Sequence, residues 1–397
     1  MIPRWGSPPR PACYNSPPAD GFPPRTPSKR RPPTLVKIQI TRRKILYLAG
    51  GSLLALAVFA LPRAYHAFTR PLGPGLELST LTPTPPIAAT PTRLDAPTPL
   101  PLPTATSTPA PLCGGPASMM VLAVGADNRE NNYLYGLADV IRVARVDFVT
   151  PSVSVLSLPR DIWVEIPEIS DHYGITHGKL NQAYLYGNPG MGYYDGPGLG
   201  PGLLARTLDA NFLLRVDHYG SVNMQTFVRI VNAVGGIDLY LPEPVDGRPI
   251  DDKTEDMGYF RAGQHHMDGA TALRFSRIRK IDNAFRRDDR QTMVLCALKQ
   301  KLVSPEVLPH IPEIIASLAE SVLTDLSLAQ LSQLACLGPY LRSENLRFAS
   351  LPEDLLHPGR NTEGSFVLNA DFDAVRELIA EFVRGTWPSE PDQPSCP

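Results

Sequence analysis

The stretch Met119-Met-Val-Leu-Ala-Val-Gly-Ala-Asp127 decides the fold, because an apolar run ending in small residues and an acid is typical of a buried β-strand. This strand would deliver Asp127 at its C-terminal end. A second strand is predicted over residues 140–148, opened by Asp139, and a third over residues 154–158. Their short connections favour an antiparallel meander, in which the end of the first strand, the start of the second and the end of the third share one edge.

That edge gathers charged side chains. Asp127, Asp139 and Arg160, which follows the third strand, are expected to be neighbours. If a phosphate group binds beside this edge, the two carboxylates suit Mg²⁺, which usually takes one or two carboxylates and completes its shell with water and phosphate oxygens. The alternative is structural: Asp127 caps a turn, and Asp139 pairs with Arg142 or Arg129.

A second informative stretch is Leu273-Arg-Phe-Ser-Arg-Ile-Arg279, in which apolar and then basic residues recur at a period of two. This period predicts a strand with one face that changes from apolar, at Leu273 and Phe275, to basic, at Arg277 and Arg279. After a short loop the period becomes helical. One stripe of this predicted helix carries Arg287, Arg290, Gln291, Val294 and Leu298.

The spacing therefore directs four guanidinium groups toward one another, those of Arg277, Arg279, Arg287 and Arg290. Arginines in a first helical turn oppose the helix dipole unless an anion lies there, and helix starts bind anions well. We interpret the cluster as a pocket for a highly charged oxyanion, most simply a pyrophosphate held by bidentate arginine forks. The alternative is a set of surface arginines paired with Asp282, Asp288 and Asp289.

Residues 45–61 contain no charged residue and, at roughly 17 residues, are just long enough to cross a bilayer as a helix. Residues 1–44 hold ten Lys and Arg and the single acid Asp20, so the positive-inside rule leaves the N-terminus in the cytoplasm. A cleaved signal peptide is the alternative, but the long basic arm and the lack of a clean small-x-small site favour an uncleaved anchor. We therefore expect a single-pass protein of the plasma membrane, with everything after Leu61 outside.

The rest of the chain divides by composition. Residues 1–44 form a basic, Pro-rich arm, and residues 62–116 form a Pro- and Thr-rich linker, which favours an extended spacer. Residues 117–385 are one large domain, followed by a tail over 386–397. Removing the ten bases and one acid of the arm from totals of 38 Lys+Arg and 39 Asp+Glu leaves 28 and 38, a net charge of −10 outside. An acidic domain with one basic cluster is a poor nucleic-acid binder.

Four of the five cysteines lie in the exported part, an even number in a compartment where disulfides persist. Three pairings are possible. We favour Cys296 with Cys336 and Cys113 with Cys396, the second tying the two ends of the domain. The pair His265-His266 is interpreted as part of an exposed turn rather than a metal site, because adjacent residues rarely point at one metal.

Several short motifs together resemble the LytR-CpsA-Psr (LCP) proteins of the bacterial cell envelope, over residues of about 121 to 297. They occur in that family's order and carry the residues discussed above. The motifs are Val124-Gly-Ala-Asp127-Asn-Arg129, Ala138-Asp139, Ser157-Leu-Pro-Arg160-Asp161, Lys179-Leu-Asn181-Gln-Ala-Tyr184, Val234-Gly-Gly-Ile237, Ala262-Gly-Gln, Asp268-Gly, Ala272-Leu-Arg-Phe-Ser-Arg277-Ile-Arg279 and Arg287-Asp-Asp-Arg290-Gln291.

The resemblance implies a three-layer α/β/α domain with a mixed central sheet and a long apolar cleft for a polyprenyl chain. It implies phosphotransfer of a glycopolymer from a polyprenyl-pyrophosphate carrier to a peptidoglycan hydroxyl, with Mg²⁺ at Asp127 and Asp139. Arg277, Arg279 and Arg160 would be the main catalytic residues, and Asp161 is either a base or a partner that orients an arginine. The pyrophosphate would be held by Arg129, Arg160, Arg277, Arg279, Arg287, Arg290 and Gln291.

Two residues depart from the family pattern. Leu137 stands where a basic residue is usual, which removes one phosphate contact, and Ala284 stands where an aspartate is usual, although Asp282 can substitute through a loop shift. Two other functions stay open: a polyprenyl-pyrophosphate sensor and a lipid pyrophosphatase without transfer. After Ser304 the apolar spacing indicates helices that complete the domain, the last over about 372–383.

Overall fold

The computed structural model describes residues 60–78, 109–128, 132–252, 254–278, 284–318, 321–387 and 396 of the 397 residues. Most of the predicted anchor, the basic arm and the centre of the linker lie outside these residues, as do Arg129, Arg279 and Asp282. A helix occupies residues 60–69. Among the helices that the structure describes, none combines the length and the hydropathy that crossing a membrane requires.

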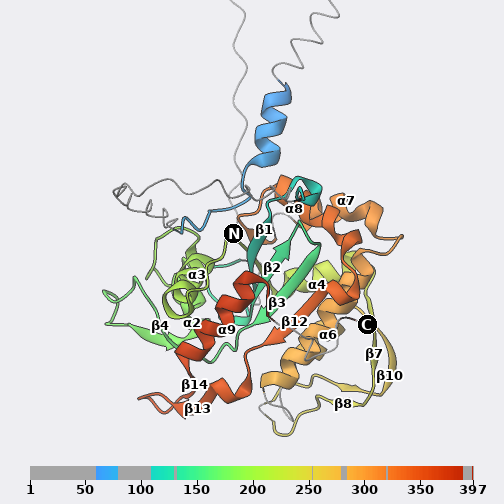
Figure 1. Cartoon of the computed structure of the whole chain (residues 1–397). Coiled ribbons are helices and arrows are strands. Elements are labelled where there is room, and N and C mark those ends of the chain that lie inside the picture. Colours follow the sequence, from blue (N-terminus) through green and yellow to red (C-terminus); the bar gives the residue numbers. More distant parts are fainter. Residues whose placement is uncertain are drawn as a thin grey trace, which may run out of the picture. The chain divides into compact units, whose positions relative to one another are not determined.

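A six-stranded mixed sheet forms the centre of the domain, in the order β11-β6-β1-β2-β3-β12 (Figure 1). The predicted antiparallel meander of β1, β2 and β3 is confirmed. Two strands from later in the sequence add in parallel, β6 beside β1 and β12 beside β3. The strands are β1 (Ser118–Ala126), β2 (Ala138–Asp147), β3 (Ser152–Ser157), β6 (His218–Asn223), β11 (Leu323–Thr324) and β12 (Leu346–Ser350).

Helices cover both faces of this sheet, which confirms the expected three layers (Figure 1). The largest apolar cluster joins one face to α2 (Leu180–Gly187), α3 (Leu199–Phe212) and α9 (Phe372–Arg384). The other face looks toward α4 (Met224–Ala233), α5 (Gly269–Arg277) and α6 (Ala284–Leu302).

The alternation in β1 shows how the two faces differ. Leu122, Val124 and Ala126 are buried in the large cluster, whereas Ala123, in the middle of a central strand, is exposed. Successive side chains in a strand point to opposite faces, so Ala123 lies on the face opposite the core. Exposure there means that the second face is not fully packed, and a cavity opens on it.

The region after Ser304 contains the predicted helices and also strands that the sequence pattern did not reveal. The helices are α7 (Ile311–Leu318), α8 (Leu328–Leu337) and α9. The unpredicted strands include the hairpin of β13 (Leu356–Arg360) and β14 (Phe366–Ala370). The other small strand pairs are β4 (Trp163–Glu165) with β5 (His177–Lys179), β7 (Ile237–Leu241) with β10 (Gly263–Met267), and β8 (Val245–Asp246) with β9 (Tyr259–Phe260).

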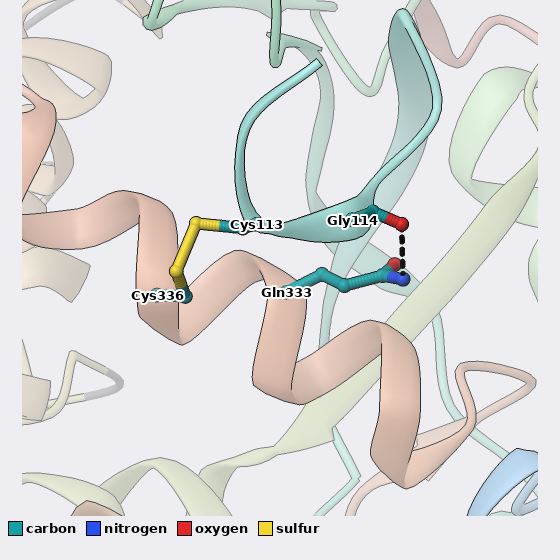
Figure 2. Close-up of a disulfide and its surroundings, with 4 residues drawn as sticks. All are labelled: Cys113, Gly114, Gln333 and Cys336. Atoms are coloured by element: carbon teal, nitrogen blue, oxygen red, sulfur yellow. Dashed lines mark hydrogen bonds between the residues drawn. A yellow bond between two sulfur atoms is a disulfide. The ribbon is translucent and has the colours of Figure 1, made fainter. Parts of the chain in front are cut away.

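The predicted disulfide pairing is wrong, although Cys113, Cys296, Cys336 and Cys396 are all paired. Cys113 bonds to Cys336 of α8, where Gln333 also donates a hydrogen bond to the carbonyl oxygen of Gly114 (Figure 2). Cys296 of α6 bonds to Cys396. The second bridge lies in a small apolar cluster with Leu346 and Phe348. The beginning and the end of the domain are therefore tied to helices, and not to each other.

The predicted strand over residues 273–279 is also wrong, because residues 269–277 form α5. Asp268 is the N-cap, and its side chain accepts a hydrogen bond from the backbone N–H of Thr271, which stabilises the helix start. Ala272 and Phe275 are buried at helical spacing. The local alternation of apolar and basic residues is compatible with both periods, and the cap together with burial of this face selects the helix.

Candidate functional site

A cavity of about 750 Å³ lies between the sheet and the helices α4, α5 and α6. Its walls also include residues of the loop that precedes β9, among them Glu255 and Met257. Both the volume and the concave shape are in the range of ligand sites. The cavity brings together most of the charged residues that the sequence singled out, together with a large apolar surface.

The floor of the cavity consists of small side chains on the sheet. Ala123 and Gly125 of β1 and Gly220 of β6 lie on the unpacked face. A Cβ added at Gly220 would meet no atom within 4 Å, so the space above it is open. The walls are apolar and come mainly from Val140, Val222, Met224, Phe227, Leu273, Val294 and Leu295. The interior therefore suits a hydrocarbon chain.

The charged end of the cavity carries six of the predicted site residues. As expected from the strand ends, Asp127 follows β1, Asp139 lies at the start of β2 and Arg160 follows β3. Helices α5 and α6 supply the others from the opposite wall. The six lining residues are Asp127, Asp139, Arg160, Arg277, Arg287 and Gln291.

A chain of ion pairs runs outward from this end. The guanidinium group of Arg160 contacts the carboxylate of Asp139 and, 3.3 Å away, that of Asp161. Asp161 also accepts a hydrogen bond from Nζ of Lys179 at 2.9 Å. Burial alone would raise the pKa of Asp161, but the Lys179 hydrogen bond and the charges of Arg160 and Lys179 outweigh it, and the pKa is lowered. A carboxylate with a lowered pKa and two cationic partners is a weak proton acceptor, so the geometry favours Asp161 as an orienting partner of Arg160.

On α5, helical spacing places Leu273, Ser276 and Arg277 on the cavity side. Arg277 forms an ion pair of 3.3 Å with Glu255, and both groups are partly exposed. Gln291 of α6 lies near the carbonyl oxygen of Ser276, at 3.5 Å. The cation is thus held at the cavity rim by a carboxylate that an anionic ligand can replace.

Arg290 lies elsewhere than predicted. Its side chain is buried, and Nη2 donates a hydrogen bond of 2.6 Å to the carbonyl oxygen of Ile278. It is not among the residues that line the described cavity. The geometry therefore gives Arg290 a role in joining α6 to the end of α5, whereas Arg287, three residues earlier, lines the cavity.

A buried network that the sequence did not predict holds α6 against the sheet. Arg142 of β2 pairs with Asp288 at 2.6 Å, and the hydroxyl groups of Ser157 and Ser350 each donate to Asp288 at 2.8 Å. Asp288 thus binds three strands of the sheet and is not a surface counter-ion of the site arginines. The predicted alternative in which Asp139 pairs with Arg142 is also not observed, because Asp139 pairs with Arg160.

Asp127 and Asp139 are suited to bind a Mg²⁺ ion whose other ligands would come from water and a bound substrate. Both line the cavity, and the Oδ1 atom of Asp127 accepts the backbone N–H of Leu137 at 2.7 Å, which fixes the carboxylate. Within the described ranges, no group of three or more His, Cys, Asp or Glu side chains could enclose a metal ion. One or two carboxylates completed by water and phosphate oxygens is the donor set that Mg²⁺ usually takes.

His265 and His266 lie in β10 and not in a turn. His266 approaches the carboxylate of Asp238 at 2.7 Å, and His265 approaches the carbonyl oxygen of Arg261 at 2.7 Å. Adjacent residues of a strand point to opposite faces, so the two imidazoles do not converge on a common metal ion.

Comparisons with known proteins agree with this geometry. Residues 114–382 match the model of the LytR_cpsA_psr family. The chain is 27% identical over 267 residues to the polyisoprenyl-teichoic acid–peptidoglycan teichoic acid transferase TagV of Bacillus subtilis, covering 66% of this chain and 63% of TagV. It is 32% identical over 217 residues to TagU, a transferase of the same description from Oceanobacillus iheyensis, covering 54% of this chain and 61% of TagU. Each match thus spans less than two thirds of the relative.

Solved structures show the same fold. The crystal structure of Bacillus subtilis TagV matches with a TM-score of 0.53 and 24% identity, covering 67% of this chain and 97% of that structure. TagT bound to LIIa-WTA matches with a TM-score of 0.52 and 21% identity, covering 68% of this chain and 90% of that structure. The family match, which covers the cavity and all its predicted site residues, settles the relationship. The chain belongs to the LytR_cpsA_psr family.

Proposed function

We propose that this protein transfers a glycopolymer from a polyprenyl-pyrophosphate carrier to a hydroxyl group of peptidoglycan and releases polyprenyl phosphate. The observation that carries the proposal is the cavity, in which a large apolar interior adjoins one end with arginine and aspartate side chains. The relatives described as polyisoprenyl-teichoic acid–peptidoglycan teichoic acid transferases support the class of reaction. A lipid with a charged head matches both parts of the cavity.

In this proposal the prenyl chain lies over the small residues of the floor, and the pyrophosphate lies between Arg160, Arg277 and Arg287. The acceptor hydroxyl attacks the phosphorus on the glycan side, a new phosphodiester forms, the bond to the bridging oxygen breaks, and the hydroxyl proton passes to an oxygen of the leaving polyprenyl phosphate or to water. The negative charge that develops on the leaving polyprenyl phosphate is stabilised by guanidinium groups already aimed at the cavity. Asp161 keeps Arg160 in position and does not take the proton.

We also propose that Asp127 and Asp139 hold a Mg²⁺ ion together with the pyrophosphate oxygens. When bound, the ion would neutralise part of the phosphate charge. Asp139 pairs with Arg160, and carboxylates beside the site would repel an anionic lipid head unless a cation compensates their charge. The proposal therefore predicts that transfer depends on a divalent cation.

The test is transfer of a labelled lipid-linked glycan to peptidoglycan fragments, measured with and without Mg²⁺ beside lipid binding. Transfer that requires Mg²⁺, with polyprenyl phosphate as the second product, supports the proposal. Lipid binding without transfer would support the sensor, and release of free glycan phosphate would support the pyrophosphatase. Full transfer in excess chelator would exclude the metal site.

We further propose that residues 45–61 anchor the protein in the plasma membrane with the domain outside, where peptidoglycan lies. The ten basic residues of the arm oppose the reverse orientation. A reporter fused after Pro397 that is active only in the cytoplasm would overturn this topology and the proposed acceptor with it.

A further inference from the structure

The ion-pair chain that leaves the cavity leads to a hairpin that projects aromatic rings to solvent. Arg160 and Asp161 precede β4 and are separated from it by Ile162 alone, and Lys179, the partner of Asp161, is the last residue of β5. Lys179 lies directly opposite Trp163 in the antiparallel pair. The surface next to the charged end of the cavity is therefore the hairpin β4–β5 itself.

One face of this hairpin is buried, and the other, which we call the open face, ranges from half-buried at Trp163 and Lys179 to exposed at Glu165 and His177. Val164 is buried, and a Cβ added at its partner Gly178 would meet Ile166 and Gln182, so this pair faces the core. The neighbouring pairs, Trp163 with Lys179 and Glu165 with His177, consequently share the opposite face. There the rings of Trp163 and His177 stack, with centroids 6.5 Å apart and planes inclined by 16°.

The far end of the same hairpin carries a second group of rings centred on Tyr193. His172 stacks on Tyr193 at 5.1 Å, and Tyr173 and Tyr186 each lie 5.8 Å from it. Residues 172 and 173 belong to the loop between β4 and β5, Tyr186 belongs to α2, and Tyr193 belongs to the loop that follows α2. We call these four residues the tyrosine cluster.

The loop holds Tyr173 outward in a conformation that a large side chain rarely adopts. Tyr173 is 88% exposed and has a φ of 56°. The loop is nonetheless fixed, because Ile169 is fully buried and the backbone N–H of Ile166 donates to the carbonyl oxygen of Thr176 at 2.8 Å. Strain that persists at an exposed aromatic side chain on a rigid loop is typical of a binding site.

Charge indicates which kind of polymer fits this surface. Asp171 is largely exposed and lies 3.7 Å from the imidazole of His172. Burial, the phenol of Tyr193 and the charge of Glu363 raise the pKa of Tyr186, so its hydroxyl stays protonated and can donate a hydrogen bond. Carboxylates beside the rings disfavour a polyanionic chain. They accept hydrogen bonds from sugar hydroxyls, and the electron-rich ring faces attract the weakly positive C–H groups of a pyranose.

We propose that the open face of β4–β5 and the tyrosine cluster bind the acceptor polysaccharide, as a chain of uncharged pyranose rings. Trp163 and His177 take a sugar near Arg160, and the tyrosine cluster takes sugars further along the same chain. This inference rests on the proposed function for the identity of the acceptor. It assigns a binding surface outside the cavity that holds the lipid.

The experiment is co-sedimentation of the full-length protein, in detergent micelles, with purified peptidoglycan sacculi stripped of attached polymers. Tyr173→Ala and Trp163→Ala are expected to weaken binding by about three- to tenfold, the range of one aromatic contact. Tyr173→Trp and Trp163→Tyr, which keep an aromatic ring, are expected to bind sacculi as the wild type does. Tyr340→Ala removes a ring that is 54% exposed on another part of the domain and is the matched control.

Transfer kinetics separate this inference from the proposed function. We expect the Ala variants to raise the KM for the acceptor and to leave donor-lipid binding unchanged. If the wild type shows no transfer but the Ala variants bind sacculi more weakly than it does, the proposed binding surface is supported and the proposed reaction is contradicted. Unchanged sedimentation and acceptor KM in both Ala variants would overturn the inference while transfer stands, as would equal losses in Tyr340→Ala.

Discussion

At the scale of single residues, Arg277 shows how a guanidinium group differs from other positively charged groups. It lies on the cavity side of α5, beside Glu255 at 3.3 Å. A planar fork can bind two phosphate oxygens at once, whereas an ammonium group acts as a point charge. The identity of the residue, and not only its charge, should therefore matter for transfer.

We predict that Arg277→Lys loses nearly as much transfer as Arg277→Ala. Removal of one such donor costs about 2.7–4 kcal/mol of transition-state stabilisation, or roughly 10²–10³ in rate. The matched control is Arg274→Lys on the same helix, because Arg274 is not among the cavity-lining residues and donates to Thr271. Near wild-type transfer by Arg277→Ala would remove this arginine from the mechanism.

The lowered pKa of Asp161 gives a second prediction, on the pH dependence of stability. Because the folded pKa lies below the unfolded value of about 3.9, the stabilisation is fully present above pH 4 and is lost as the pH falls through the folded pKa. At pH 7, Asp161→Asn should therefore lower the free energy of unfolding by about 1–3 kcal/mol.

Urea unfolding of wild type and variant from pH 7 downward measures this effect, and the difference should shrink below pH 4. The control is Asp209→Asn, since the pair of Asp209 with Arg215 is more exposed and should contribute less than about 1 kcal/mol. A constant difference between Asp161→Asn and wild type down to the lowest pH would show that the ion pairs of Asp161 do not stabilise the fold.

The sequence predicted the convergence of Asp127, Asp139 and Arg160, because strand ends in a meander share an edge whatever packs against them. It could not distinguish Arg287 from Arg290. Both belong to the inward side of α6, but only the position of α5 decides that Arg290 meets the carbonyl oxygen of Ile278. Arg142 was likewise missed as a structural residue, since its partner Asp288 is 146 positions away in the sequence.

At the scale of elements, β1 and β6 form a floor that accepts a ligand because their side chains are small. We predict that Gly220→Leu fills the cavity and weakens binding of the polyprenyl chain by at least about tenfold, because each CH₂ denied burial is worth about 0.8 kcal/mol. The fold should survive, since the new Cβ meets no atom within 4 Å.

A fluorescent polyprenyl phosphate measures the binding, and circular dichroism checks the fold. Gly75→Leu is the matched control, because a Cβ at Gly75 also meets no atom within 4 Å and Gly75 does not line the cavity. Equal lipid affinity of Gly220→Leu and Gly75→Leu would place the lipid elsewhere.

The incorrect strand at residues 273–279 has a physical reason at the same scale. Seven residues are too few to separate a period of two from a period of 3.6 when apolar and basic positions alternate. The decisive signal, Asp268 followed by Gly269 before the run, was present in the sequence as an N-cap. Tertiary burial of Ala272 and Phe275 then fixes the side of α5 that carries Arg277 toward the cavity.

At the scale of the whole molecule, the disulfides tie distant segments to the helical layers. Four cysteines allow three pairings, and the choice depends on which helices lie near the two ends of the domain, which composition does not reveal. The bridge Cys113–Cys336 spans 223 positions, and Cys296–Cys396 spans 100. Leu295, next to Cys296, lines the cavity, so the second bridge also holds a cavity wall.

We predict that Cys296→Ser with Cys396→Ser lowers the free energy of unfolding by about 2–5 kcal/mol. Cys113→Ser with Cys336→Ser is the matched comparison, and loop entropy alone makes its loss larger by only about 0.7 kcal/mol. Cys296 of α6 packs on Leu346 and Phe348 of β12. The double variant at Cys296 and Cys396 should therefore also reduce lipid affinity, whereas the double variant at Cys113 and Cys336 should not. Denaturant unfolding and lipid binding of both double variants measure this, after peptide mapping has verified the remaining bridge. Equal lipid affinity of the two double variants would show that both disulfides contribute to stability alone. The position of the cavity wall would then depend on the Arg142–Asp288 network.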